Sequence, residues 1–175
     1  KVYGYSLEPP TKKNLYKIAN IKKIIKKEKI ANINNYNTLK RFIDSNKIEI
    51  IFHLAAQSLV RRSYENPFQT IKSNTMGTAS ILECIRNCNS VKTAIIVTTD
   101  KVYKNTKVKN FYKETDSLGG REVYCSSKAA AELLVESYSD SFFSTEKKNY
   151  KYIATARAGN VIGGGDWAKD RLIPD

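Results

Sequence analysis

The sequence has 175 residues, 41% of them hydrophobic, and carries a formal net charge of +13. This length and composition fit one globular domain with a sizeable core. The apolar runs are strand-sized, well below the roughly 20 residues of a membrane-spanning helix, and no signal-peptide pattern is present, so we expect a cytoplasmic protein without a membrane partner.

Much of the positive charge lies in one tract, residues 12–29, where lysines alternate with isoleucine and asparagine. Such a tract is typical of a solvated helix face, and Lys, Asn, Ile and Tyr are frequent throughout the chain, which indicates a general compositional bias. We therefore expect no nucleic-acid partner. An inactive basic fragment that binds nucleic acid is kept as the alternative from another functional class.

Three cysteines and one histidine are the residues that most often signal metal or nucleophile chemistry. Cys84, Cys88 and Cys125 are odd in number and lack the paired spacing of a zinc site, so we expect buried free thiols, no disulfide framework and no metal. His53 stands without a nucleophile motif and is interpreted as structural.

The first predicted elements are two strands around a weak helix. Residues 1–5 predict a strand, residues 14–28 a helix and residues 29–33 a strand that ends at a polar turn. A dinucleotide-binding unit normally starts with a strand, a Gly-x-Gly-x-x-Gly turn and a helix whose N-terminus holds the pyrophosphate. The sequence lacks that motif. We expect an incomplete domain without its first strand-helix unit, which binds a dinucleotide weakly or not at all.

An amphipathic helix and an apolar strand follow. The helix covers residues 36–46, and the near-continuous apolar run over residues 48–54 predicts a central parallel strand buried on both faces. Leu54, Ala55 and Ala56 form the turn at the carboxyl end of this strand. Small residues at this position would allow a dinucleotide to approach the backbone closely, although a tight turn into a helix explains them equally well.

A long helix is predicted over residues 66–88, with Pro67 in its first turn. Its apolar stripe includes Ile71, Ile81 and Ile85, and Asn74 lies on the same side. A polar amide within an apolar stripe needs a hydrogen-bonding partner. Support of a catalytic or cofactor site is favoured over a satisfied core asparagine, and both explanations remain open.

The strongest chemical signal joins the next strand to the next helix. An apolar strand ends at Thr99, Asp100 and Lys101, and ligands of open parallel sheets bind at this end of the strands. Tyr124 and Lys128 are four residues apart, which places both side chains on one helix face. An ammonium group near a phenol favours the phenolate and lowers its pKa, so this pair is suited to deprotonating an alcohol.

These motifs resemble the extended short-chain dehydrogenase/reductase family. The resemblance rests on the strand that ends in Thr-Asp-Lys, on Tyr-x-x-x-Lys, and above all on the run Arg-Ala-Gly-Asn-Val-Ile-Gly-Gly-Gly-Asp-Trp at residues 157–167. It covers nearly the whole chain and is strongest for the branch that dehydrates CDP-glucose. It implies an α/β fold, a Rossmann-like doubly wound parallel sheet, with residues 1–175 forming part of the NAD-binding domain and the carboxyl-terminal substrate domain absent.

The resemblance also implies a reaction, in which CDP-glucose loses water to give CDP-4-keto-6-deoxyglucose with tightly held NAD. Tyr124 would take the proton of the sugar 4-hydroxyl, Lys128 would lower the pKa of Tyr124 and bind the nicotinamide ribose, and Thr99 would hold the 4-oxygen. Asp100 would be the acid at the departing 6-hydroxyl, assisted by Lys101. An epimerase on the same scaffold, which needs Tyr124 and Lys128 alone, is the alternative enzyme.

The binding residues are likewise implied by the resemblance. The implied contacts with NAD come from Tyr124 and Lys128 and from Asn32, Ile33, Leu54, Ala55, Ala56 and Asn74. Contacts with the nucleotide sugar are implied for Thr99, Asn160, Arg171 and Leu172. The family often has Asp where this chain has Asn32, so the adenine would meet an amide here. A homodimer through the helix over residues 124–143 is also implied.

Overall fold

The computed structural model describes residues 1–105, 111–144, 146 and 150–170. Its strands are β1 (Tyr3–Ser6), β2 (Lys27–Ile30), β3 (Ile50–His53), β4 (Thr93–Val97) and β5 (Tyr152–Ala156). Its helices are α1 (Leu15–Ile18), α2 (Ile21–Ile24), α3 (Tyr36–Ser45), α4 (Val60–Glu65), α5 (Pro67–Ile71), α6 (Gly77–Asn87) and α7 (Val123–Tyr138). The π-helical turns η1 (Lys72–Met76) and η3 (Ser139–Phe143) and the 3₁₀ turn η2 (Asp100–Val102) complete the set.

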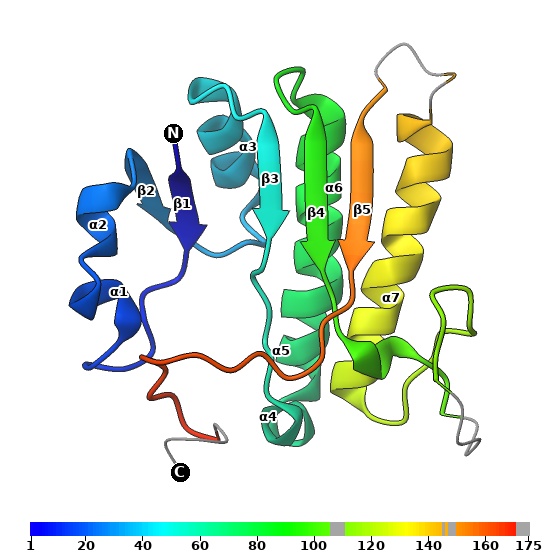
Figure 1. Cartoon of the computed structure of the whole chain (residues 1–175). Helices are drawn as coiled ribbons and strands as arrows, with labels where there is room; N and C mark the ends of the chain where they lie inside the picture. The colour runs from blue at the N-terminus through cyan, green and yellow to red at the C-terminus, as the bar shows by residue number, and fades with distance from the viewer. Residues whose placement is uncertain (106–110, 145, 147–149, 171–175) are drawn as a thin grey trace.

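The strands form two parallel groups. β1 pairs with β2, and β3, β4 and β5 pair in that order. All five arrows point the same way in Figure 1, and α3, α6 and α7 lie on one side of the sheet. The predicted parallel α/β fold with helical crossovers is therefore confirmed.

The core lies between the three-stranded group and the helices α3 and α6. Leu82 and Ile85 of α6 and Ile96 of β4 have no exposed surface. Burial of each such side chain contributes about 2 kcal/mol before the entropy cost of ordering the chain. This packing fixes β4, whose carboxyl end carries the predicted catalytic residues.

The prediction for β3 is wrong in one respect. Its burial alternates, with Ile51 and His53 buried and Ile50 and Phe52 exposed by 58% and 62%. Among the described residues, helices cover one face of the three-stranded group (Figure 1). The prediction of a strand buried on both faces is therefore wrong for the described structure, because the second face of β3 has no helix packed on it there.

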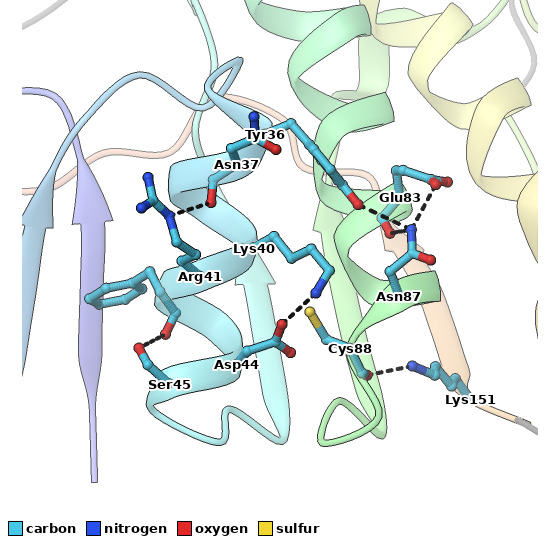
Figure 2. A network of polar contacts seen from close by, with 11 residues as sticks. Tyr36, Asn37, Lys40, Arg41, Asp44, Ser45, Glu83, Asn87, Cys88 and Lys151 are labelled. Carbon is cyan, nitrogen blue, oxygen red and sulfur yellow. Dashed lines mark hydrogen bonds and ion pairs between the residues drawn. The ribbon is translucent and has the colours of Figure 1, made fainter.

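Polar contacts at the rim tie α3 to α6, as Figure 2 shows. The Asn87 amide donates to the hydroxyl of Tyr36 at 3.1 Å and to the carboxylate of Glu83 at 2.7 Å. On α3, Lys40 pairs with Asp44 at 2.6 Å. Of these contacts, the hydrogen bond between Asn87 and Tyr36 joins the two helices, and the other two lie within one helix each.

The glycine-rich segment after β5 runs across the carboxyl ends of the strands toward α1 (Figure 1). The N–H of Leu15 donates to the carbonyl of Gly165 at 3.0 Å, and Arg61 of α4 pairs with Asp170 at 2.9 Å. The segment therefore spans the edge of the sheet at which ligands of parallel sheets bind. Among the described residues, no helix has the length and apolar character needed to cross a membrane.

Candidate active site

The end of β4 is held in place by the end of β5. The N–H of Thr98 donates to the carbonyl of Ala156 at 2.9 Å, and the N–H of Asp100 donates to the carbonyl of Ala158 at 3.0 Å. The chain then turns into η2, where the Thr99 hydroxyl donates to the Asp100 carboxylate at 3.1 Å. Thr99 is 6% exposed, whereas Asp100 is open to solvent. A buried hydroxyl and an accessible carboxylate thus stand side by side.

The first turn of α7 presents Tyr124 to Thr99. Glu122 caps this helix, and its carboxylate accepts from the N–H groups of Tyr124 at 2.6 Å and Cys125 at 2.9 Å. A carboxylate at a helix N-terminus is favourable because the exposed N–H groups there carry partial positive charge. Burial raises the pKa of Tyr124 above its ordinary value, and its hydrogen bond with Thr99 opposes that shift.

Lys128 lies one turn further along α7 and is 5% exposed. Its ammonium donates to the carbonyl of Val97 at 2.9 Å, and burial lowers its pKa to about 8. The predicted lowering of the Tyr124 pKa is wrong for this chain, because burial of the phenol outweighs the opposing effects. The ammonium is nevertheless fixed at the end of β4, one helical turn from the phenol.

The five predicted catalytic residues therefore come together at the meeting point of β4, η2 and α7. Thr99, Asp100 and Tyr124 are linked by hydrogen bonds, and a hydrogen bond to the Val97 carbonyl holds Lys128 one helical turn from Tyr124. Lys101 is exposed on η2 and close enough to Cys125 of α7 to lower the thiol pKa against the larger effect of burial. A phenol, a hydroxyl, a carboxylate and two lysine side chains are therefore gathered at one site.

Most of the predicted cofactor residues line a second, adjoining hollow. A cavity of about 340 Å³ lies at the carboxyl ends of β1, β2 and β3. Its lining includes Asn32, Ile33, Leu54, Ala55 and Ala56. This volume is within the range of small-ligand sites, which start near 300 Å³. The structure thus gathers these separately predicted residues around one space.

Ile33 also explains the glycine that opens α6. A Cβ atom on Gly77 would lie 2.8 Å from the Ile33 side chain, closer than real contacts allow. The turn after β2 therefore rests directly on the backbone of α6. This close packing holds Ile33 at the wall of the hollow.

Asn74 lies on the π-helical turn η1 and is 1% exposed. Its amide oxygen accepts from the N–H of Gln57 at 2.8 Å, and its amide nitrogen donates to the Gln57 carbonyl at 3.0 Å and to the Ser127 hydroxyl at 2.9 Å. The partner that this buried amide requires is therefore found within the protein. Asn74 joins the turn after β3 to α7, and a direct contact with a cofactor stays a prediction.

The predicted substrate residues are only partly described. Asn160 is exposed in the segment after β5, and a Cβ atom on its neighbour Gly159 would lie 3.6 Å from the Asp100 carboxylate. Asn160 is therefore the residue next to the one that approaches the Asp100 carboxylate. Arg171 and Leu172 lie outside the described residues.

Sequence reasoning missed a buried ion pair beneath the site. The Glu132 carboxylate pairs with the Arg157 guanidinium through contacts of 3.0 and 3.1 Å and also accepts from the Thr98 hydroxyl. Arg157 also contacts the loop after η2. Its guanidinium lies 4.8 Å from the centroid of the Tyr103 ring and donates to the Glu114 carbonyl at 3.0 Å. Glu132 lies four residues after Lys128, so helix spacing alone could have placed Glu132 on the face of α7 that carries the site. No sequence spacing indicates that Arg157 pairs with it.

The comparisons with known proteins agree with this arrangement. The family model described as GDP-mannose 4,6 dehydratase matches residues 7–146. CDP-glucose 4,6-dehydratase of Salmonella typhimurium is 42% identical over 178 residues, covering 99% of this chain and 49% of the relative. The dTDP-D-glucose 4,6-dehydratase of Dictyostelium discoideum is 31% identical and covers 82% of this chain and 33% of that protein. The chain spans half or less of the length of these relatives.

Solved structures show the same fold. A dTDP-glucose 4,6-dehydratase from Bacillus anthracis in complex with NAD superposes with a TM-score of 0.77 at 22% identity, covering 99% of this chain and 50% of that one. A second one from Streptomyces venezuelae gives 0.73 at 24% identity, with 85% and 42% covered. Together with the family match over residues 7–146, these findings establish that the chain belongs to the GDP-mannose 4,6 dehydratase family.

Proposed function

We propose that the protein containing this chain is an NAD-dependent nucleotide-sugar 4,6-dehydratase, a hydro-lyase that converts CDP-glucose to CDP-4-keto-6-deoxyglucose and water. The observation that carries the proposal is the 42% identity to a CDP-glucose 4,6-dehydratase over 99% of the chain. The hydrogen-bonded cluster of Thr99, Asp100 and Tyr124 supports it. Because the chain spans about half of that relative, the activity is proposed for the whole protein.

The residues present fit part of an NAD site. The hollow of about 340 Å³ has small side chains at Ala55 and Ala56, amide groups at Asn32, and a guanidinium at Arg62. Small residues permit close approach of a nucleotide, and the polar groups offer hydrogen bonds to its base and phosphates. When bound, NAD would supply the acceptor of the electron pair that leaves sugar C4 and the donor of the electron pair that reduces C6.

The proton chemistry at C4 falls to α7 and β4. Tyr124 would accept the proton of the 4-hydroxyl while the Thr99 hydroxyl, already hydrogen-bonded to it, holds the same oxygen. The Lys128 ammonium, held by the Val97 carbonyl, would stabilise the phenolate once the substrate excludes water from the site. This arrangement makes Tyr124 the base for the oxidation at C4.

Elimination of water is assigned to Asp100 and Lys101. A 4-ketone acidifies the proton at C5, which a base must take up, and the 6-hydroxyl must be protonated because hydroxide is a poor leaving group. Asp100 would donate that proton from its exposed position beside Thr99, and Lys101 would assist from the next position of η2. Asn160 and, further on, Arg171 and Leu172 would contact the nucleotide diphosphate.

The finer expectations on partners and location belong to the same proposal. A nucleotide-diphosphate sugar would be the substrate, a homodimer the assembly, and the cytoplasm the compartment. Leu133 of α7 and Phe142 of η3 are exposed by 55% and 42%, which supports a contact through this helix.

The test is turnover of CDP-glucose by the whole protein, followed by mass spectrometry of the nucleotide sugar. We expect a product that has lost one water, and we expect Tyr124→Phe to lower turnover by about 100-fold or more. Tyr138→Phe on the same helix is the matched control and should keep the parent rate. A product of unchanged mass with altered stereochemistry at C4 would instead identify an epimerase, and an unaffected Tyr124→Phe variant would contradict the assigned base.

A further inference from the structure

Three ionisable side chains of α7 lie in one row against the end of β4. Tyr124, Lys128 and Glu132 follow one another at four-residue spacing, which places them on the same face of the helix. All three residues are buried, with exposed fractions of 8%, 5% and 5%. The row thus extends the Tyr-x-x-x-Lys pair by one helical turn and ends in a carboxylate.

Residues 97–99 hold this row, one residue for each side chain. The Val97 carbonyl accepts from the Lys128 ammonium at 2.9 Å, the Thr98 hydroxyl donates to the Glu132 carboxylate, and the Thr99 hydroxyl is hydrogen-bonded to Tyr124. The carboxylate is therefore fixed on the same strand end as the ammonium and the phenol. A change at one member of the row can act on the others through this shared strand end and through charge.

Glu132 is ionised despite its burial. Burial raises the pKa of its carboxyl group, but hydrogen bonds from Arg157, Thr98 and Thr155 outweigh this effect and bring the pKa below its ordinary value. The Arg157 guanidinium donates to both carboxylate oxygens, at 3.1 and 3.0 Å. Near neutral pH a buried anion therefore lies one helical turn from the buried ammonium of Lys128.

This anion favours the charged form of Lys128. Burial lowers the pKa of Lys128 to about 8, and the Glu132 carboxylate opposes that shift. The attraction between the two charges is screened weakly in the protein interior, where the effective dielectric constant is lower than in water.

Three other ionisable side chains at the site are uncharged near neutral pH. Burial raises the pKa of Tyr124 and that of Cys125 above their ordinary values, and it lowers the pKa of His53 on β3 to about 4. These groups therefore do not offset the charge of Lys128.

The charged groups that remain at the site are placed less favourably for this role. Asp100 and Lys101 of η2 are open to solvent, which screens their charges. The Glu122 carboxylate lies at the start of α7 and accepts from N–H groups of the helix, and the guanidinium beside Glu132 is itself a cation. Glu132 is therefore the buried counter-charge of Lys128.

We propose that Glu132 is a positioning residue of the active site, which keeps the Lys128 ammonium charged and held at the end of β4 beside Tyr124. Without this carboxylate, Lys128 would lose its proton at lower pH and would no longer stabilise the phenolate of Tyr124. The inference deepens the proposed dehydratase function and rests on it for the effect on turnover. The charge of Lys128 can be measured without turnover.

The direct test is the titration of Lys128 in the whole protein, followed by NMR of isotope-labelled lysine ε-carbons, with Lys128→Met to identify the resonance. Glu132→Gln should lower the midpoint by about one pH unit or more. Glu132→Gln combined with Arg157→Met should do the same without leaving an unpaired guanidinium, which protects the fold. Glu132→Asp, which keeps the charge, should restore most of the parent midpoint. Glu136→Gln, at an exposed carboxylate one turn further along α7, is the matched control and should not change it.

The pH dependence of CDP-glucose dehydration gives the second readout. We expect the rate of Glu132→Gln to fall at lower pH than the parent rate on the alkaline side, by the same interval as the Lys128 midpoint. A purely structural role would lower the rate equally at every pH, and this result would overturn the proposal. An unchanged Lys128 midpoint in both variants that lack the carboxylate would also overturn it. A lowered midpoint in a protein that does not dehydrate CDP-glucose would support the coupling of Glu132 to Lys128 and contradict the proposed function instead.

Discussion

At the scale of single residues, Lys128 and His53 are two ionisable side chains whose burial disfavours the charged form. Burial lowers the pKa of Lys128 to about 8 and that of His53 to about 4, and the Lys128 charge adds to the second shift. His53 is therefore neutral near neutral pH, with its ring nitrogen 3.2 Å from the Thr78 hydroxyl. Lys128 remains the buried cation of the site.

This burial predicts a pH dependence of stability that Lys128→Met removes. The pKa of Lys128 is lowered from 10.5 to about 8 on folding. Between these values the unfolded chain binds more protons than the folded one, so the Lys128 contribution to the free energy of unfolding rises with pH. Below about pH 8 the full cost of the buried ammonium remains. Lys128→Met should therefore gain stability relative to the parent near neutral pH and lose that advantage toward about pH 10.

The measurement is urea unfolding of the parent chain and of the Lys128→Met variant from neutral pH to about pH 10. Burial raises the pKa of Cys84 from 9.0 to about 12, which destabilises the folded state as pH rises through that interval. Because both chains contain this thiol, the difference between them isolates Lys128. A difference that does not change with pH would show that the ammonium is not buried as described.

At the scale of secondary-structure elements, side-chain contacts add to the backbone pairing of β4 and β5 in connecting the pieces of the site. The ion pair of Glu132 and Arg157 joins α7 to the segment after β5, with side chains 5% and 16% exposed. The Arg157 guanidinium also lies over Tyr103, whose ring stacks on Tyr112 at 4.6 Å. This pair therefore sets the position of the loop beside Asp100.

Glu132→Gln should be strongly destabilising, because it leaves the Arg157 charge buried without its partner. We expect a loss of about 3 kcal/mol in the free energy of unfolding, measured by urea denaturation. Lys92→Ala, which breaks the exposed pair with Glu49 at 2.6 Å, is the control and should cost less than about 1 kcal/mol. Equal effects of the two substitutions would contradict the structural role given to the buried pair.

The π-helical turn makes a second connection that can be tested. Asn74→Leu leaves the backbone N–H and C=O of Gln57 without their partner, whereas the Ser127 hydroxyl keeps its bond to the Tyr124 carbonyl. We expect a loss of about 2 to 4 kcal/mol, since unsatisfied buried groups cost about 1 to 3 kcal/mol each. Ser80→Ala, at an exposed hydroxyl of α6, should stay within about 0.5 kcal/mol of the parent. A near-neutral Asn74→Leu variant would favour a role confined to ligand binding.

These connections mark the boundary of what the sequence could predict. Periodicity predicted α3 within one residue, and strand-end chemistry placed Thr99, Asp100 and Tyr124 at one site. The tract over residues 14–28 was expected to be one weak helix, but it forms the short helices α1 and α2 and the start of β2. The pairing of Glu132 with Arg157 depends on how α7 and β5 pack, which no spacing rule encodes.

At the scale of the whole molecule, the chain is a parallel α/β unit whose strand ends carry the cluster of Thr99, Asp100 and Tyr124 and the hollow of about 340 Å³. Strand β3, on which Ile50 and Phe52 are exposed, leads into the turn at Leu54 that lines this hollow.

The central claim is that Asp100 protonates the departing 6-hydroxyl. Asp100→Asn in the whole protein keeps the size of the side chain but cannot donate that proton, so dehydration of CDP-glucose should slow by about 100-fold or more. Asp140→Asn, on η3, is the matched control and should retain the parent rate. A CDP-glucose analogue with fluorine at C6, which leaves as fluoride without protonation, should restore much of the lost rate to Asp100→Asn. Dehydration of CDP-glucose at the parent rate by this variant, or no rescue by the fluorinated analogue, would contradict the account.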